Sequence, residues 1–310
     1  MNNFVTRLHL KTSVADAENG RKKLIDFCLS NPDAQYLAIG WSNVHSEEEQ
    51  IYSYSDFYDA VKKCNKKYGK KRIDSALNLF NYAQENDLFW TRDLDGFYWI
   101  CRVKDNAVAL RNDELDIGAA IPVEAYKYGL EVPGQIKAAF NRPRGGIVQK
   151  LYEKNILEFS KYVFNNLSGK ELYEISVEND TDIIDNLPDF QLEELVISYI
   201  QLKYNYYLLS NSIANKSTTI KIECEFMSRE KGNIDKAVVQ VKAKKGCIDV
   251  LKYKNYLEKE YKVFFYSCNY TNRIENKNII YITRDELLDF YKEYKTNLPE
   301  SITIWENLFD

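Results

Sequence analysis

The sequence predicts a mixed α/β protein, of the α+β kind, and three observations predict it. The 310 residues are enough for two ordinary domains. Short runs rich in β-branched and aromatic residues alternate with stretches whose apolar residues recur at helical spacing. A polar and acidic stretch over 166–188 separates two such patterned regions. We therefore expect a first domain over 1–150, a helical and acidic linker over 151–188 and a second domain over 189–310.

The composition narrows the class of protein. Apolar residues make up 45% and charged residues 28%, as in ordinary soluble proteins. The net charge of −4 argues against a protein that is basic all over, but it allows a local basic groove. The six cysteines are scattered without a CxxC pair, which predicts reduced intracellular thiols rather than zinc ligands or disulfides. The two histidines argue against catalysis built on several histidines.

No apolar run approaches the ~20 residues that a membrane helix needs. The start, MNNFVTRLHLKTS, lacks the long apolar core of a signal peptide. We therefore expect a cytoplasmic protein with no membrane partner.

The first region mixes strands and helices. Residues 36–42 (YLAIGWS) predict a buried strand, and residues 87–103 predict a β-hairpin, because two β-rich runs flank the strong turn signal Asp95-Gly96. Pro122 and two later prolines interrupt the remainder of this region. Helical spacing predicts three helices, with Ser55 as the N-cap of the first, over 55–71, 72–85 and 151–165.

The second region has a clearer pattern. An apolar stripe at helical spacing predicts a helix over 190–205. The order expected after it is strand, strand, helix, strand, strand and helix, with Thr283 capping the last helix. The ranges are 218–230, 237–244, 248–261, 262–269, 278–283 and 284–295.

The second of these strands, in KAVVQVKAKKG (236–246), carries two polar residues on one face. Side chains alternate along a strand, so Gln240 and Lys242 point the same way. A metal-dependent nuclease needs carboxylates for Mg²⁺ and a cation near the scissile phosphate. Glu223 and Glu225 lie on the preceding strand, and Asp235 in the turn is a competing acid. The alternative is an edge strand with one face in water.

The run IECEF…AVVQVKAKKG resembles the PD-(D/E)xK nuclease superfamily, especially restriction-endonuclease-like members with a QxK motif. The resemblance covers 189–310 and implies an αβββαβ core with a mixed sheet. It implies that Glu223 binds Mg²⁺, for which Mn²⁺ can substitute, and that Gln240 helps to position metal or water. It also implies that Lys242 stabilises charge on the phosphate. Glu rather than Asp on the second strand departs from the family pattern.

The helix over 190–205 resembles the family's first helix, which often supplies a further acid. By register Glu193 is the better match to that acid and a further metal ligand, with Glu194 in reserve. Members of this superfamily can lose cleavage and keep binding, so an inactive relative stays open as an alternative.

Three segments of the first region, 36–42, 87–93 and 96–103, resemble the PUA-like superfamily and its EVE-type members. The resemblance implies a small β-barrel with helices, whose pocket accepts a flipped and modified base such as methylated cytosine. Aromatic stacking and edge hydrogen bonds would offset the cost of extruding the base. The alternative is that these residues belong to the core, where a Trp in a strand more often lies. The candidate pocket residues are Trp41, Trp90, Asp93, Tyr98 and Trp99.

Clustered cations predict contacts to the DNA backbone. One cluster is the run KKCNKKYGKKR (62–72), and another is Arg142 and Arg144 beside a Gly pair. The alternative for each is a solvated helix end or surface loop. The remaining candidates for backbone contact are Lys66, Lys67 and Lys244.

Together these patterns predict a modification-dependent DNA endonuclease that restricts foreign phage DNA. Its partner would be double-stranded DNA with modified cytosine as the candidate base. A homodimer is expected from the family, because paired active sites cut both strands. The alternatives are a catalytically inactive nucleic-acid-binding sensor and a structural or regulatory partner of other proteins.

Overall fold

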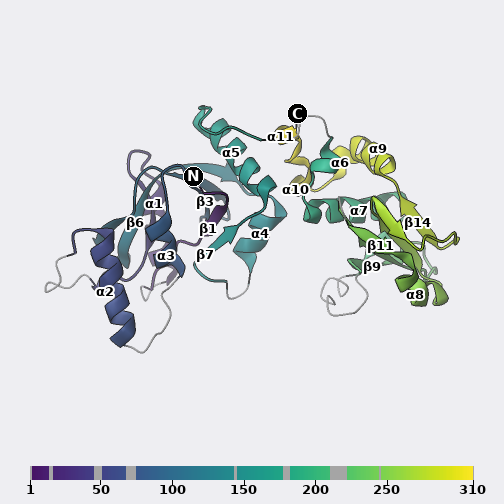
Figure 1. Ribbon diagram of the computed structural model, residues 1–310, viewed down its shortest axis with the longest axis horizontal. Coiled ribbons are helices and arrows are strands. Elements are labelled where there is room, and N and C mark those ends of the chain that lie inside the picture. The colour runs from purple at the N-terminus through teal and green to yellow at the C-terminus, as the bar shows by residue number, and fades with distance from the viewer. Residues whose placement is uncertain are drawn as a thin grey trace. The chain divides into compact units, whose positions relative to one another are not determined.

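The computed structural model describes residues 2–13, 17–44, 51–67, 75–142, 145–176, 182–209, 222–243 and 246–309 (Figure 1). The chain divides into two units, Met1–Val177 and Glu178–Asp310. Each unit mixes helices and strands, as the sequence predicts. The boundary lies inside the expected linker, later than the predicted end of the first domain at residue 150.

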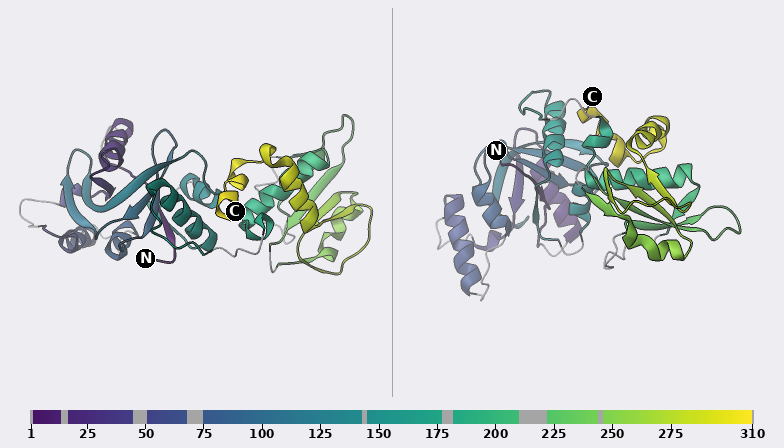
Figure 2. Two further views of the ribbon diagram at one scale, coloured as in Figure 1. Left: turned by 90° about the horizontal axis from the view of Figure 1, so that it is seen from above. Right: turned by 45° about the vertical axis from the view of Figure 1, so that its right-hand side comes forward.

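Seven strands form the sheet of the first unit. Their order is β2-β6-β4-β3-β1-β7, with β5 beside β6, and only the β1–β3 pairing is parallel among the described strands. The sheet curls as a half-barrel rather than closing into the expected barrel, because no described pairing joins the end strands β2 and β7 (Figure 2). The strands are β1 (Val5–Leu8), β2 (Gln35–Ile39), β3 (Leu88–Arg92), β4 (Tyr98–Val103), β5 (Val108–Asn112), β6 (Ile117–Gly129) and β7 (Val148–Leu151).

Pro122 lies inside the long strand β6 and does not break it. Along one edge β6 pairs with β5 through residues 117–120 and with β4 through residues 123–129. Pro122 occupies the gap between these two partners, where its carbonyl accepts a hydrogen bond from the Lys104 N–H at 3.0 Å. The nitrogen and carbonyl of one strand residue point to the same side, so the missing N–H falls where no ladder bond is required.

Helices cover both faces of this sheet. The helices α1 (Ala17–Leu29), α2 (Tyr54–Lys67) and α3 (Ser75–Tyr82) build one core with buried residues of the strands. On the other face lie α4 (Gly134–Asn141) and α5 (Lys154–Ser168). The predicted hairpin is confirmed as β3 and β4. A short 3₁₀ turn, η1 (Ser42–Val44), follows β2.

The assignment of residues 151–168 to a linker is wrong, because α5 is packed into the first unit. The indole of Trp90 on β3 donates a hydrogen bond to Ser160 Oγ at 2.8 Å and stacks near Phe159 of α5. Trp90 has no exposed surface. The sequence correctly predicted this helix, but the aromatic partner that holds it lies some seventy residues upstream.

The second unit contains a mixed five-stranded sheet in the order β14-β12-β10-β9-β8. The β8–β9 and β9–β10 pairings are antiparallel, whereas β10–β12 and β12–β14 are parallel. The strands are β8 (Tyr206–Leu208), β9 (Cys224–Ser228), β10 (Lys236–Val241), β12 (Lys262–Tyr266) and β14 (Ile279–Ile282), with β11 (Cys247–Asp249) and β13 (Asn269–Thr271) forming a separate parallel pair.

Helices cover the two faces of this sheet as well. Phe264 faces the side of α7 (Asp189–Lys203) and α9 (Arg284–Tyr294), through ring contacts that include Tyr204 at 4.9 Å. Phe265 faces the 3₁₀ turn η3 (Val250–Tyr253), whose Tyr253 ring lies 4.9 Å away. The remaining helical segments are α6 (Ile183–Asn186), α8 (Lys254–Glu258), η4 (Lys295–Asn297), α10 (Glu300–Thr303) and α11 (Glu306–Phe309).

Of the two N-cap residues predicted from the sequence, one is confirmed and one is wrong. Thr283 is confirmed as a cap: its side chain accepts the Glu286 N–H in a complete capping box. The prediction for Ser55 is wrong, because Ser53 exchanges hydrogen bonds with Asp56 instead. The predicted helix over 248–261 is divided into β11, η3 and α8.

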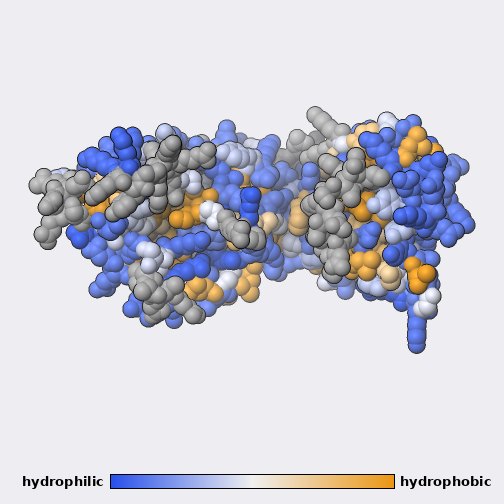
Figure 3. Space-filling view, turned by 90° about the horizontal axis from the view of Figure 1, so that it is seen from below, coloured by the Kyte–Doolittle hydropathy of each residue, from blue (hydrophilic) through white to orange (hydrophobic). Residues whose placement is uncertain are grey.

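No helix within the described ranges is both long and apolar enough to span a membrane. Apolar residues on the face drawn in Figure 3 form separate patches among hydrophilic ones. All six cysteines are free thiols.

The packing of Trp90 yields a stability prediction. Replacing Trp90 by Ala should lower the free energy of unfolding of the first unit by about 3–5 kcal/mol, because it leaves a cavity between β3 and α5. Tyr82→Ala is the control, since Tyr82 is 65% exposed in the same unit. Urea unfolding followed by circular dichroism measures both, and equal midpoints for the two variants would contradict the assignment of Trp90 to the core.

Candidate active site

The predicted pairing of Glu223 with Gln240 is present in the second unit. The register of β9 and β10 pairs Cys224 with Val239, and one further step places Glu223 opposite Gln240. The Glu223 N–H donates to the Val239 carbonyl at 2.9 Å. The Gln240 amide Nε2 donates to Glu223 Oε1 at 2.7 Å. The two side chains therefore share one face near the carboxyl end of β10.

Every polar atom of the Gln240 amide is engaged. Nε2 also donates to the Val241 carbonyl at 2.9 Å, and Oε1 accepts from the Tyr253 hydroxyl at 2.9 Å. Only 1% of Gln240 is exposed, and a buried amide needs such partners. In this arrangement Gln240 is a buried connection between strands and η3. The expected role of Gln240 at a metal stays a prediction, because the amide oxygen that accepts from Tyr253 has a second lone pair.

Burial and the charge of Glu223 together shift the pKa values of two neighbouring groups. Burial and then the Glu223 charge raise the pKa of the Tyr253 phenol, so this hydroxyl stays protonated and keeps its role as donor. Burial, then Glu223 and then Glu193, also raise the pKa of the Cys224 thiol. Cys224 therefore remains a neutral thiol rather than a thiolate ligand or nucleophile.

Lys242 leaves the end of β10 on the same face as Gln240, because the two residues are two apart. Its N–H donates to the Tyr266 carbonyl at 2.8 Å, and the residue is half-buried. A Cβ added to Gly246 would lie 2.7 Å from Lys242 Cβ, so this glycine makes room for the lysine stem. Within the described residues Lys242 forms no ion pair with a carboxylate.

The two acids proposed from α7 have different surroundings. Glu194 Oε2 accepts a hydrogen bond from Ser301 Oγ of α10 at 2.7 Å, which identifies it as a helix-docking residue. Glu193 is half-buried and close enough to Cys224 to affect the pKa of its thiol. Cys224 pairs with Val239 and shares its sheet face, opposite to the face of Gln240. The structure therefore places Glu193 beside Cys224 rather than on the Gln240 face.

The two other acids of the hairpin, Glu225 and Asp235, lie at different distances along the strands from Gln240. Glu225 pairs with Val238 and shares the face of Glu223, two residues further along β9. The carbonyl of Asp235 accepts the Ser228 N–H beyond the first residue of β10, at the end of the strand opposite to Gln240. Asp235 therefore lies away from Gln240, whereas Glu223 and Glu225 both share the Gln240 face and Glu223 contacts the Gln240 amide.

The residues around Gln240 allow a test of fit to Mg²⁺. No group of three or more His, Cys, Asp or Glu side chains in the described part of the chain is placed to hold a metal. Two oxygens do converge, because Glu223 Oε1 and the Val241 carbonyl both accept from the same nitrogen, Gln240 Nε2. Mg²⁺ commonly takes one or two protein oxygens and keeps several waters. Glu223 Oε1 and the Val241 carbonyl are oxygens of this kind, and a metal bound to both would take the place of Gln240 Nε2 between them. The predicted donor set of Glu223, Gln240 and Glu193 stays a prediction.

The residues predicted for a base pocket in the first unit do not form one pocket. Trp90 and Tyr98 are 0% and 2% exposed and belong to the core, so their prediction as pocket walls is wrong. Asp93 accepts from the Phe97 N–H at 2.8 Å and from the Trp99 indole at 3.0 Å. It braces the hairpin turn instead of offering a free edge contact.

Trp41 alone of the five lines a hollow of about 600 Å³ beside Gly40, Ser42 and Asp116. Its backbone has φ 66°, a left-handed conformation that costs energy for any residue except glycine and that often marks functional sites. Asp116 holds the rim by accepting hydrogen bonds from Ser13 and from the Ser42 N–H, the latter at 3.2 Å. Asp93 and Trp99 line a different hollow, so the predicted five-residue pocket is divided.

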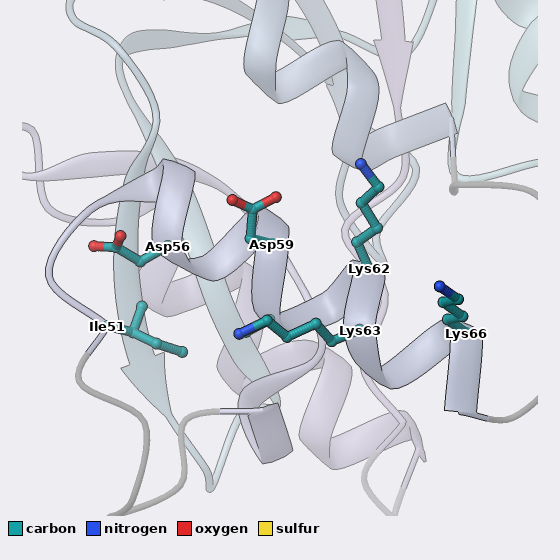
Figure 4. A pocket seen from close by; sticks show the side chains of 7 residues that line it. Ile51, Asp56, Asp59, Lys62, Lys63 and Lys66 are labelled. Carbon is teal, nitrogen blue, oxygen red and sulfur yellow. The ribbon is translucent and has the colours of Figure 1, made fainter.

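The predicted backbone contacts are only partly described. Lys66 lines a surface hollow on α2 that also contains Asp56 and Asp59 (Figure 4). Arg142 is exposed directly after α4. Arg144, Lys244 and the side chain of Lys67 lie outside the described residues.

Sequence reasoning missed the partners that complete both sites. Tyr253 was hidden in an expected helix, and Asp116 carried no motif. Thirteen positions separate Tyr253 from Gln240, which no strand or helix periodicity connects.

Comparison of the chain with protein-family models, curated proteins and solved structures found no significant match.

The Glu223–Gln240 contact generates a prediction about metal. Gln240→Glu places two carboxylates 2.7 Å apart, which raises the pKa of the pair in the folded state. A raised folded-state pKa means that stability is lost as pH rises, so the variant should lose about 1–3 kcal/mol at pH 8 and less at pH 5. Mg²⁺ should restore the melting temperature at pH 8.

The double variant Glu223→Gln/Gln240→Glu is the matched control, because it keeps a single carboxylate and reverses the contact. It should show a smaller pH dependence and a smaller response to Mg²⁺. Thermal unfolding with Mg²⁺ or with EDTA measures all variants. A Gln240→Glu protein whose stability ignores both pH and Mg²⁺ would contradict the two-oxygen site.

Proposed function

We propose that the protein is a Mg²⁺-dependent DNA endonuclease that hydrolyses phosphodiester bonds, with Mn²⁺ as an acceptable substitute. Its role would be modification-dependent restriction of foreign phage DNA. The observation that carries the proposal is the Glu223–Gln240 contact at the carboxyl end of β10, with Lys242 two residues on along the same face. A carboxylate, a neighbouring carbonyl oxygen and a lysine are groups that metal-dependent phosphodiester hydrolysis uses.

The arrangement of the second unit supports this proposal. A helix is followed by an antiparallel hairpin, a further helical turn and a strand parallel to the hairpin's second strand. This agrees with the core expected of a PD-(D/E)xK nuclease of the QxK kind. In the proposed roles, Glu223 and the Val241 carbonyl hold the metal, which supplies charge neutralisation of the phosphate. Gln240 orients Glu223, and Lys242 stabilises negative charge on the scissile group.

The first unit would recognise the DNA. The Trp41 hollow supports this role, because an aromatic side chain on a strained turn borders a space of about 600 Å³. A flipped base needs an aromatic surface and hydrogen-bonding groups at its edge. Trp41 would supply the aromatic surface, and the residues around Asp116 would supply the hydrogen-bonding groups. The substrate would be double-stranded DNA, with modified cytosine as the candidate base, cut by a homodimer with one active site for each strand.

A second candidate function is a nucleic-acid-binding sensor without cleavage. The full engagement of the Gln240 amide favours it, as does the lack of a three-acid cluster among the described residues. Both candidates use the same two sites, and only cleavage separates them.

The role of Lys242 gives a direct test. Lys242→Ala should abolish plasmid cleavage in Mg²⁺ or Mn²⁺ while leaving DNA binding nearly unchanged, because it removes the charge that stabilises the phosphate. Lys236→Ala is the matched control, since Lys236 begins the same strand on the same face. Cleavage and gel-shift assays are run in parallel, with EDTA as the metal-free arm. Undiminished cutting by Lys242→Ala, or full activity in EDTA, would refute the proposed roles.

The Trp41 hollow gives a separate test. Trp41→Ala should erase the preference between matched DNAs that differ only in cytosine modification, whereas Trp99→Ala should keep it, because Trp99 lines the other hollow. Competitive binding measures the ratio of affinities for the two DNAs. A ratio that survives Trp41→Ala would exclude this hollow as the reader of the base.

A further inference from the structure

Two arginines and a histidine contact the ring of Phe140 in the first unit. The guanidinium carbons of Arg7 and Arg92 lie 5.9 and 5.4 Å from the ring centroid. The imidazole of His9 meets the same ring edge-on at 5.1 Å. Phe140 itself is 4% exposed, so it forms an apolar floor under three basic groups.

Arg7 is the buried part of this cluster. It has no exposed surface, and its guanidinium donates to the Gly146 and Ile147 carbonyls at 2.6 and 2.9 Å and to Gln149 Oε1 at 3.3 Å. All three acceptors are neutral, and Nε has no hydrogen-bond partner in the described chain. Burial and then the neighbouring Arg142 lower the pKa of Arg7. A buried arginine without an acid is costly and uncommon.

The accessible members of the cluster also lack acids. Arg92 donates to Asn141 Oδ1 at 3.0 Å and is half-buried. Arg142 is exposed, its carbonyl accepts the Gly145 N–H at 3.1 Å, and Gly145 lies beside the Arg7 guanidinium. Across the described residues, none of Arg7, Arg92 and Arg142 forms an ion pair with a carboxylate. The positive charge is therefore concentrated and left uncompensated.

The pKa of His9 is lowered by burial and by this positive charge. Burial, followed by the charges of Arg7, Lys11, Arg21 and Arg92, lowers the pKa of His9 to about 4. The imidazole is consequently neutral at pH 7, and an anion that offset those charges would raise its pKa.

We infer that the cluster of Arg7, His9, Arg92 and Arg142 is a phosphate-binding site for the backbone of a nucleic acid. Arginine forks match phosphate oxygens. Arg92 lies over the Phe140 ring, and exposed Arg142 is close enough to Arg7 for its charge to add to burial in lowering the pKa of that guanidinium. Arg7 holds the 145–147 segment in place beneath them through its two carbonyl contacts. The inference rests on the proposed function only in choosing nucleic acid as the source of phosphate.

Histidine NMR on the full chain tests the inference without cleavage. The chain has two histidines, His9 and His45, so His45→Gln assigns both resonances. A duplex of sixteen base pairs in EDTA should raise the pKa of His9 by one unit or more. An unchanged pKa at saturating duplex would overturn the inference. The same would follow if inorganic phosphate raised the pKa and DNA did not, because the site would then serve free phosphate.

The salt dependence of duplex binding in EDTA supplies a second, independent test. Arg92→Gln and Arg142→Gln should each reduce the slope of log K against log salt by about 1, as expected for one lost phosphate contact. Arg92→Lys should keep the slope. Arg111→Gln should also keep it, since exposed Arg111 already pairs with Asp113 at 2.9 Å.

Unchanged slopes for both glutamine variants would overturn the site. Absence of any duplex affinity in the wild-type chain at low salt would do the same. The nuclease proposal fails separately: reduced slopes together with no cleavage under any metal condition would leave the phosphate site standing and remove the nuclease.

Discussion

The hydrogen bonds of one buried amide, that of Gln240, are the constraint on which the second unit's site depends. This amide joins Glu223 before β9, the Val241 carbonyl of β10 and Tyr253 of η3. An unmet donor or acceptor at such a position would cost about 1–3 kcal/mol, so the three elements keep their places together. The Glu223 carboxylate is consequently held in position on the face from which Lys242 also leaves the strand. A preorganised acid of this kind needs no rearrangement of the backbone to meet a ligand.

Each unit contains charged side chains whose hydrogen-bond partners are neutral, and the charges are of opposite sign in the two units. In the second unit the hydrogen-bond partner of Glu223 is a neutral amide, and in the first unit Arg7 and Arg92 donate to neutral oxygens. Charges withdrawn from water without a counter-ion reduce stability. Proteins accept such costs mainly at functional sites, where a ligand supplies the missing charge. A hard cation would match the acidic site and a phosphodiester the basic one, as the proposed function requires.

The sequence predicted secondary-structure elements better than it predicted the tertiary contacts of individual side chains. Periodicity and turn chemistry identified the hairpin at Asp95-Gly96, the capped helix after Thr283 and the antiparallel pair that carries Glu223 and Gln240. The incorrect predictions arose where one sequence pattern is compatible with two local structures. Ser53 and Ser55 are both possible caps, and Pro122 would interrupt most strands. It is tolerated in β6 because Pro122 lies between the part of β6 that pairs with β5 and the part that pairs with β4.

The sequence by itself determined where several elements form, such as β3, β4, β10 and α9, and which side chains share a strand face, because these depend on neighbours along the chain. It therefore placed Gln240 and Lys242 together. Tertiary structure alone decided that Trp90 is core while Trp41 borders a hollow, since both suit either place. It also decided that Arg7 meets the Gly146 carbonyl, 139 positions away. Burial and long-range contacts depend on how distant segments pack, and no local pattern records that.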